Sequence, residues 1–313
     1  MEHAADYRAW PKAELHLHLE GSVDPETMQG LEPDLSPEDI RAMYHFTDFQ
    51  GFLQTFKWVV ERLRTPEDYA AITRGLLQRL TRDTVRYAEI TISAGVVLWK
   101  GQEFGPVYSA IRQAAAEFPI EVRWILDAVR QFGPERAMEV AQLAVDRVDD
   151  GVIAFGIGGD EERGPAHWFR DIYAFARQSG LRLTAHAGET AGPASIWGAL
   201  EIGAERIGHG IRAIDDPVLL RHLSDRRIPL EVCITSNVMT GAVESLERHP
   251  VRRLFDAGVP ITLNTDDPGI FAVTLSGEFE LAAARFGFSA NELRAVASNA
   301  FRFAFASPAP AQD

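Results

Sequence analysis

The segment "ELHLHLEGS", residues 14–22, places His16 and His18 on either side of one leucine, in a run that otherwise has the pattern of a short strand. Side chains i and i+2 of a strand point to the same face, so both imidazoles are expected on one side of a sheet. Polar rings on an inner face need a partner, which is either a neighbouring polar group or a ligand. The segment therefore predicts a first strand that ends in functional side chains.

The rest of the chain alternates short apolar runs with longer segments of helical periodicity, such as "RAMEVAQLAVDRV" at 136–148. Including the first segment, eight runs are candidate strands, at 14–19, 86–92, 121–127, 152–157, 181–186, 206–209, 229–234 and 260–265. Eight strands with helices between them favour an α/β fold of the (β/α)8 TIM-barrel type over a doubly wound sheet. We expect a single domain over residues 1–313, with 306–313 as a frayed tail.

A long helical excursion is expected between the first two strands, with "FTDFQGFLQTFKWVVERL" at its centre. Phe49, Phe52, Leu53 and Phe56 recur there at i, i+3, i+4 and i+7, which is one face of a helix. Two interpretations fit this face. It packs into the core, or the helix over 49–62 is an apolar lid on the mouth of a pocket.

Composition restricts the partners of the chain. A net charge of -14 and a pI near 5.1 disfavour binding to nucleic acid or to an anionic membrane, so a small molecule is the expected partner. No apolar run is long enough to span a bilayer, and no export signal is recognisable near Met1. The one cysteine, Cys233, cannot form an internal disulfide, which predicts a cytoplasmic location. The sequence gives no indication of the oligomeric state.

Polar side chains also follow other predicted strands. His186 and Glu189 close the fifth, His209 lies between glycines at the end of the sixth, and Asp266 and Asp267 follow the eighth. Taken singly, the Asp-Asp-Pro segment could be a capped turn, and Glu189 could be a carboxylate at a helix start. Active sites of TIM barrels lie at the C-terminal rim of the strands, so the coincidence of these groups predicts an active site there.

Three imidazoles and one carboxylate at this rim match the ligand preferences of Zn²⁺ with one position left open. Bound zinc lowers the pKa of water and so supplies a nucleophile near neutral pH. Glu189, His209 and Asp267 then remain free for proton transfer and for steering the nucleophile. A purely structural metal would leave these three groups without a role.

Six segments resemble the adenosine deaminase family of the amidohydrolase superfamily. They are "PKAELHLHLEGS" at 11–22, "GGDE" at 158–161, "HAGE" at 186–189, "ERIGHG" at 205–210, "CITSNVMTGAV" at 233–243 and "LNTDDP" at 263–268. The resemblance implies a barrel that binds one Zn²⁺. The implied metal ligands are His16, His18, His186 and Asp266.

The resemblance also implies roles for the remaining groups. Glu189 would protonate N1 of a 6-aminopurine, and His209 would orient the attacking water and take part in its deprotonation. Asp267 would hold the nucleophile and bind N7, and the backbone N–H of Gly159 would reach N3. Together with the lid interpretation, the expected substrate-contacting residues are His18, Glu20, Gly159, Asp267, Phe52 and Phe56.

The exact substrate is less well determined by these motifs. The resemblance favours deamination of adenosine or a close nucleoside, yet family members acting on adenosine usually have Asp where this chain has Glu20, and adenine deaminases have Glu. The segment "TISAGVVLWK" at 91–100 is similar to the corresponding segment of aminodeoxyfutalosine deaminases. Deamination of aminodeoxyfutalosine is therefore the alternative function. Deamination of adenine is a less favoured function, and nucleoside binding without catalysis is the least favoured.

Two related zinc chemistries are disfavoured by residues that the chain lacks. The fourth strand ends "GIGGDEE" without the lysine that bridges two metals in other amidohydrolases, and the nearest lysine in sequence is Lys100. Cytidine-type deaminases need a pair of thiolates at the metal, and Cys233 stands alone.

Overall fold

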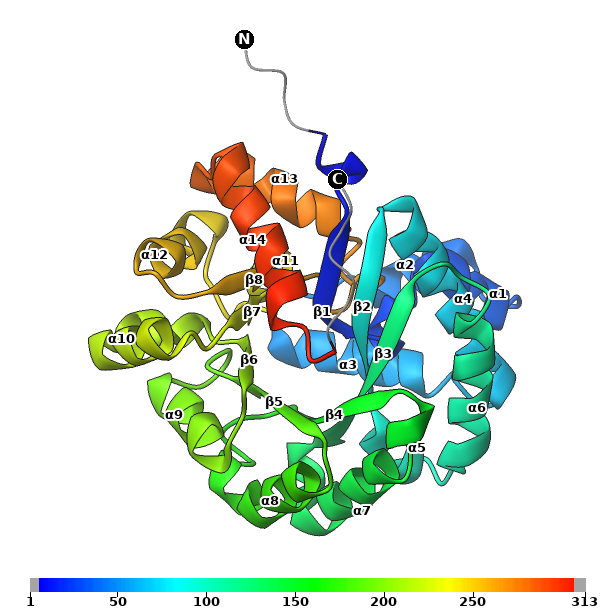
Figure 1. Ribbon diagram of the computed structural model, residues 1–313. Coiled ribbons are helices and arrows are strands. Elements are labelled where there is room, and N and C mark those ends of the chain that lie inside the picture. The colour runs from blue at the N-terminus through cyan, green and yellow to red at the C-terminus, as the bar shows by residue number, and fades with distance from the viewer. Residues whose placement is uncertain (1–5, 307–313) are drawn as a thin grey trace.

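A computed structural model describes residues 6–306 and contains eight parallel strands that pair in sequence order. In Figure 1 the strands surround a common centre and most helices lie outside them, which confirms the predicted TIM-type barrel. Residues 1–5 and 307–313 are not described, so the predicted frayed tail lies outside the described residues from position 307 onward. The strands are β1 (Lys12–His18), β2 (Val85–Ile92), β3 (Glu121–Val129), β4 (Val152–Gly158), β5 (Arg182–Ala187), β6 (Arg206–His209), β7 (Leu230–Val232) and β8 (Ile261–Leu263).

The strand boundaries agree with the sequence prediction to within two residues at each end. All seven residues of β1 are buried, as expected for a parallel strand with one face on the barrel interior and the other under the helix layer. The barrel closes between β8 and β1 through an isolated parallel bridge between Leu17 and Asp266.

Most of the surrounding helices begin at a recognisable sequence signal. Pro66 opens α4 behind a capping box of Thr65 and Asp68, and Ser289 with Glu292 forms a second capping box at α14. Among residues 6–306 no helix is both long enough and apolar enough to cross a membrane. The helices are α1 (Pro25–Leu31), α2 (Pro37–Met43), α3 (Phe49–Val60), α4 (Pro66–Arg82), α5 (Ala94–Trp99), α6 (Phe104–Ala115), α7 (Gly133–Val145), α8 (Arg170–Gln178), α9 (Pro193–Ile202), α10 (Pro217–Arg226), α11 (Ile234–Met239), α12 (Val251–Asp256), α13 (Leu275–Phe286) and α14 (Ala290–Phe303).

The excursion between β1 and β2 consists of α1 to α4. Asp48 caps α3 by accepting a hydrogen bond from the backbone N–H of Gly51 at 2.8 Å. On the apolar face of α3, Phe52 is buried and stacks on Phe271 with ring centroids 5.3 Å apart. The face therefore packs into the core, and it also lines the cavity described below. Movement of α3 as a lid stays a prediction.

At the N-terminal end of the strands, the fully buried guanidinium of Arg206 links four segments of the chain. Its Nε donates to Glu231 at 2.6 Å, and Nη2 lies 2.5 Å from a carboxylate oxygen of Glu89. Nη1 donates to the carbonyl of Phe303 at 3.0 Å, and the guanidinium carbon stacks 3.5 Å above the ring centroid of Phe305. The segment after α14 is thereby attached to the barrel interior.

Replacement of Arg206 by leucine is expected to destabilise the protein by about 3–5 kcal/mol, because two buried carboxylates would lose their counter-charge. The free energy of unfolding from urea denaturation of the zinc-loaded protein measures this effect. Arg136→Leu is the matched control, since the Arg136–Glu139 pair is exposed and contributes less than about 1 kcal/mol. Equal losses in the two variants would contradict this role of Arg206.

Candidate active site

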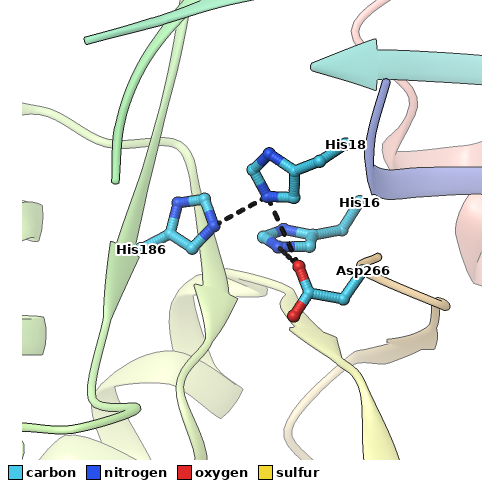
Figure 2. A group of neighbouring side chains, drawn as sticks. All are labelled: His16, His18, His186 and Asp266. Carbon is cyan, nitrogen blue, oxygen red and sulfur yellow. Dashed lines mark hydrogen bonds and ion pairs between the residues drawn. The ribbon is translucent and has the colours of Figure 1, made fainter. Parts of the chain in front are cut away.

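Three histidines and one aspartate meet at the C-terminal end of the barrel strands. His16 and His18 come from β1, His186 from β5, and Asp266 follows β8; one ligand atom of each lies within 4.8 Å of all the others. Nε2 of His18 is 3.1 Å from Nε2 of His186, and Oδ1 of Asp266 is 3.3 Å from both Nε2 of His16 and Nε2 of His18. Figure 2 shows the three rings and the carboxylate directed toward one centre.

Backbone pairing places Asp266 in this cluster. The N–H of His18 donates to the carbonyl of Asp266 at 2.7 Å, and the N–H of Asp266 donates to the carbonyl of His16 at 3.1 Å. Asp266 itself has φ of 64°, in the left-handed region that is costly for a residue with a side chain. Strained backbone of this kind concentrates at functional sites. The closure of the barrel and the geometry of the cluster thus depend on the same residue.

Three of the four candidate ligand residues are held by a hydrogen-bond partner outside the cluster. Nδ1 of His16 lies 2.8 Å from a carboxylate oxygen of Glu231, and Nδ1 of His186 lies 3.2 Å from the carbonyl of Ile157. The hydroxyl of Ser236 donates to Oδ2 of Asp266 at 2.6 Å. Such outer partners fix ring orientation and tautomer in protein metal sites.

The chemistry of this donor set fits a zinc ion. Burial lowers the pKa of His18 to about 4 and that of His186 well below its usual value, so both rings are neutral and can ligate. Burial alone would raise the pKa of Asp266, but neighbouring imidazoles hold it well below its usual value. Among the described residues, Nε2 of His16 has no hydrogen-bond partner. Three nitrogens and one oxygen in this arrangement match zinc sites with an open position.

A second group of potential ligands, His209, Cys233 and Asp266, shares one member with the first. Burial raises the pKa of the Cys233 thiol well above its ordinary value, and a thiol must lose its proton to bind a metal. The three-histidine group is therefore the better candidate for an ion.

The loop after β5 carries Glu189, and the side chain of Glu161 binds the backbone of this loop. The Glu161 carboxylate accepts backbone N–H bonds from Gly188 at 2.7 Å and from Glu189 and Thr190 at 2.9 Å. Burial raises the pKa of Glu189 well above its usual value, with the charge of Asp266 as the second cause. The Glu189 carboxyl is therefore disposed to carry a proton near neutral pH.

Asp267 packs closely against the turn that follows β1. A Cβ on Gly21 would come within 1.5 Å of Oδ1 of Asp267, so only glycine allows this turn to approach the carboxyl group. No described residue donates a hydrogen bond to that buried Oδ1. Burial and the adjacent Asp266 both raise the pKa of Asp267 well above its usual value. Asp267 lines the cavity, so its carboxyl group borders any ligand bound there.

His209 ends β6 with φ of 60°, again in the left-handed region. Its Nε2 lies 3.6 Å from Oε2 of Glu189 and 3.9 Å from Oδ2 of Asp266. On the other side of the ring, the side-chain amide of Asn237 is 3.0 Å from Nδ1. His209 therefore borders both the acidic residue of the loop and the candidate metal cluster.

A cavity of about 370 Å³ opens above these groups. Its floor contains His18, His186, Glu189, His209, Asp266 and Asp267, all of which were expected at the rim. Its mouth is apolar and is formed by α3, α5 and the segment after β3. The apolar lining residues are Phe49, Phe52, Leu53, Phe56, Val60, Val96, Trp99, Val129 and Phe132. A polar floor under an aromatic mouth is typical of sites for ligands that are polar at one end only.

Five of the six expected substrate-contacting residues line this cavity: His18, Gly159, Asp267, Phe52 and Phe56. Glu20 is completely buried, and its carboxylate accepts the backbone N–H of Ser93 at 3.1 and 3.3 Å instead of lining the cavity. Burial raises the pKa of Glu20 to about 7. Contact between Glu20 and a ribose stays a prediction, although Glu20 does support Ser93, which does line the cavity.

Several cavity residues were missed by sequence reasoning. Asp127 lies at the end of β3, lines the cavity and is buried, and burial raises its pKa to about 7. Its place in the run "WILDAV" is the signal used for the other strand ends and could have identified it. The stacking of Trp99 on Phe132, with centroids 6.2 Å apart, joins two loops and has no comparable signal in sequence.

Comparison with known proteins agrees with the fold and with a metal site. The sequence model of the adenosine deaminase family matches residues 11–312. Aminodeoxyfutalosine deaminase of Streptomyces avermitilis is 40% identical over 309 residues, covering 94% of this chain and 86% of the relative. The crystal structure of adenine deaminase from Arthrobacter aurescens has a TM-score of 0.89 and 32% identity, covering 96% of this chain and 95% of that one. An amidohydrolase from Burkholderia ambifaria with bound zinc has a TM-score of 0.89 and 29% identity, covering 98% and 90%.

Gly208→Ala is expected to weaken zinc binding by about 10- to 100-fold, because a Cβ there would lie 2.7 Å from Cε1 of His16 and displace the ring. Competition with a chromophoric chelator measures the affinity. Gly30→Ala is the control, since a Cβ at Gly30 meets no described atom within 4 Å. Unchanged affinity in Gly208→Ala would contradict the placement of His16 at the metal.

Proposed function

This chain belongs to the adenosine deaminase family, and we propose that it hydrolyses the 6-amino group from an aminopurine nucleoside in the cavity above the histidine cluster. The observation that carries the proposal is the set of groups on one cavity floor: a site suited to zinc, the Glu189 carboxyl disposed to hold a proton, and the carboxyl group of Asp267. These are the parts that a hydrolytic deamination requires.

We assign a single Zn²⁺ to His16, His18, His186 and Asp266. When bound, this ion supplies a water of lowered pKa that can attack a ring carbon at neutral pH. The chain contributes the outer partners that keep the ligand atoms turned inward, above all Glu231 against His16.

Glu189 is proposed to donate a proton to N1 of the purine as attack at C6 develops charge on the ring. The burial that raises the pKa of this carboxyl keeps it protonated before substrate enters. Glu161 keeps the loop in place, because three successive backbone N–H groups are bound to its carboxylate. The acid is thus positioned by the backbone and not by its own side-chain contacts alone.

Asp267 and Gly159 are proposed to fix the purine over the floor. The carboxyl group of Asp267 borders the cavity and can hydrogen-bond the ring edge at N7 or hold the nucleophile, and its raised pKa allows it to donate. Gly159, directly after β4, lines the same cavity, and its backbone N–H is the proposed donor to N3. His209 borders the reacting carbon from the side of Glu189.

The apolar mouth favours a nucleoside with a bulky group at the 5′ end. Free adenine would occupy the floor and leave the aromatic surface of Phe56, Trp99 and Phe132 without contact. The 40% identity to aminodeoxyfutalosine deaminase of Streptomyces avermitilis supports the same choice. We therefore propose aminodeoxyfutalosine as the preferred substrate and adenosine as the next.

Adenine is the second candidate, and two observations favour it. The similarity in fold to adenine deaminase from Arthrobacter aurescens extends over 96% of this chain. In addition, the carboxylate of Glu20 is bound to the backbone of Ser93 and does not enter the cavity as a ribose ligand.

The values of kcat/KM for aminodeoxyfutalosine, adenosine and adenine, measured by ammonia release from zinc-loaded protein, separate these candidates. We expect the order aminodeoxyfutalosine, adenosine, adenine. Trp99→Ala is expected to lower kcat/KM for the first substrate by about 3- to 10-fold and to leave adenine unchanged, because only an extended ligand reaches the mouth. Trp168→Ala, at an exposed tryptophan outside the cavity lining, is the control. A preference for adenine would overturn the assignment of substrate, and absence of ammonia from all three would overturn the proposed function.

Glu189→Gln is expected to lower kcat by at least about 100-fold while zinc content stays unchanged, because an amide cannot deliver the proton to N1. Steady-state kinetics and elemental analysis measure the two quantities. Glu162→Gln, at an exposed carboxylate three residues after Gly159, should keep full activity. Near-normal turnover by Glu189→Gln would show that another group is the acid.

A further inference from the structure

A chain of buried hydrogen bonds runs from the start of α12 to the ring of His209. The backbone N–H of Val251 is 3.2 Å from Nδ1 of His249, and Nε2 of His249 is 3.2 Å from Oδ1 of Asn237. The side-chain nitrogen of Asn237 is 3.0 Å from Nδ1 of His209. The three side chains are at most 4% exposed, so water does not compete for these bonds.

The backbone end of this chain sets the protonation of His249. A peptide N–H can only donate, and at the first turn of a helix it has no partner within the helix. Nδ1 of His249 must therefore accept from Val251, which leaves the ring proton on Nε2. Burial also lowers the pKa of His249 to about 3, in agreement with a neutral ring that carries one proton.

The proton on Nε2 of His249 in turn orients the amide of Asn237. An N–H facing this amide needs its oxygen, so Oδ1 accepts from His249 and the NH₂ group points to His209. The flipped amide would bring two donors together at 3.2 Å in a buried site, which would cost about 1–3 kcal/mol or more. The orientation of the amide follows from its partners and not from its shape.

The amide then determines the tautomer of His209. Because the NH₂ group of Asn237 donates to Nδ1, this nitrogen is an acceptor and the proton of the neutral ring is on Nε2. The surroundings of Nε2 agree with this result: it lies 3.6 Å from a carboxyl oxygen of Glu189 and 3.9 Å from one of Asp266, and both oxygens can accept a hydrogen bond. A bare Nε2 would direct a lone pair toward the carboxylate of Asp266, whose pKa is held well below its usual value by the neighbouring imidazoles.

We propose that His249 is a positioning residue that acts through Asn237 to hold His209 in the Nε2–H form, so that His209 presents a hydrogen-bond donor to the reacting centre. This inference rests on the proposed function for the role of that centre. It also makes the role expected of His209 from the sequence more specific, because a nitrogen that carries a proton orients the nucleophile by donating a hydrogen bond to it.

Long-range ¹H–¹⁵N spectra of zinc-loaded protein with ¹⁵N-labelled histidine read the tautomers directly. The ring nitrogens of His209 and His249 should each show one protonated Nε2 and one unprotonated Nδ1, with assignment by single His→Gln variants. A protonated Nδ1 on either ring would overturn the proposal. This measurement needs no substrate, so it decides the tautomer even if no 6-aminopurine is deaminated.

Asn237→Asp replaces the donating NH₂ by a second acceptor at nearly constant shape. Nδ1 of His209 should then become protonated, and kcat should fall by about 10- to 100-fold while KM and zinc content stay near those of the native protein. A native kcat together with a newly protonated Nδ1 would show that the tautomer has no role in turnover and would overturn the proposal.

His249→Phe keeps a planar ring, of slightly larger volume, and removes both nitrogens. The amide of Asn237 is then free to flip, and the His209 signals should change from one tautomer to a mixture, with kcat reduced and KM retained. Unaltered His209 signals would contradict the positioning role of His249. The matched control is Thr240→Val, which deletes a buried 2.8 Å hydrogen bond to the carbonyl of Ser236 in the same helix but lies outside this chain of bonds. It should change neither the spectra nor kcat.

Discussion

The closure of the barrel between β8 and β1 is the constraint on which the site depends. Two backbone hydrogen bonds join Asp266 to His16 and His18, and the same three residues direct their side chains to one centre. The left-handed backbone of Asp266 makes this possible, because it lets the residue pair with β1 and still turn its carboxylate inward. The contacts that close the barrel are therefore the same contacts that place these three candidate metal ligands.

The interior of the barrel connects this site to the opposite end. Glu231 holds His16 through one carboxylate oxygen and Arg206 through the other, and Arg206 reaches the segment after α14. Buried charges are stabilising only when each is fully partnered, and here the partners span the height of the barrel. His209 stands on the same strand as Arg206, but its own orientation comes from α11 and α12 through Asn237 and His249.

Much of the fold and of the cavity floor could be predicted because both obey short-range rules. Alternation within β1 placed His16 and His18 on one face, and the rule that barrel sites lie at strand ends placed His186, His209 and Asp266 near them. Side-chain direction inside a turn follows no such rule: Glu20 turns to the backbone of Ser93, which only the three-dimensional structure reveals. The roles of Glu231, Asn237 and His249 depend on contacts between distant segments, and no spacing in the sequence encodes them.

Anomalous diffraction at the zinc edge from crystals of the zinc-loaded protein tests the central claim most directly. The account predicts one strong peak, with Nε2 of His16, His18 and His186 and a carboxylate oxygen of Asp266 about 2.0–2.2 Å from it. A peak bounded by His209 and Cys233, or no peak within reach of the three histidines, would contradict the assignment of this cluster as the metal centre of the deaminase.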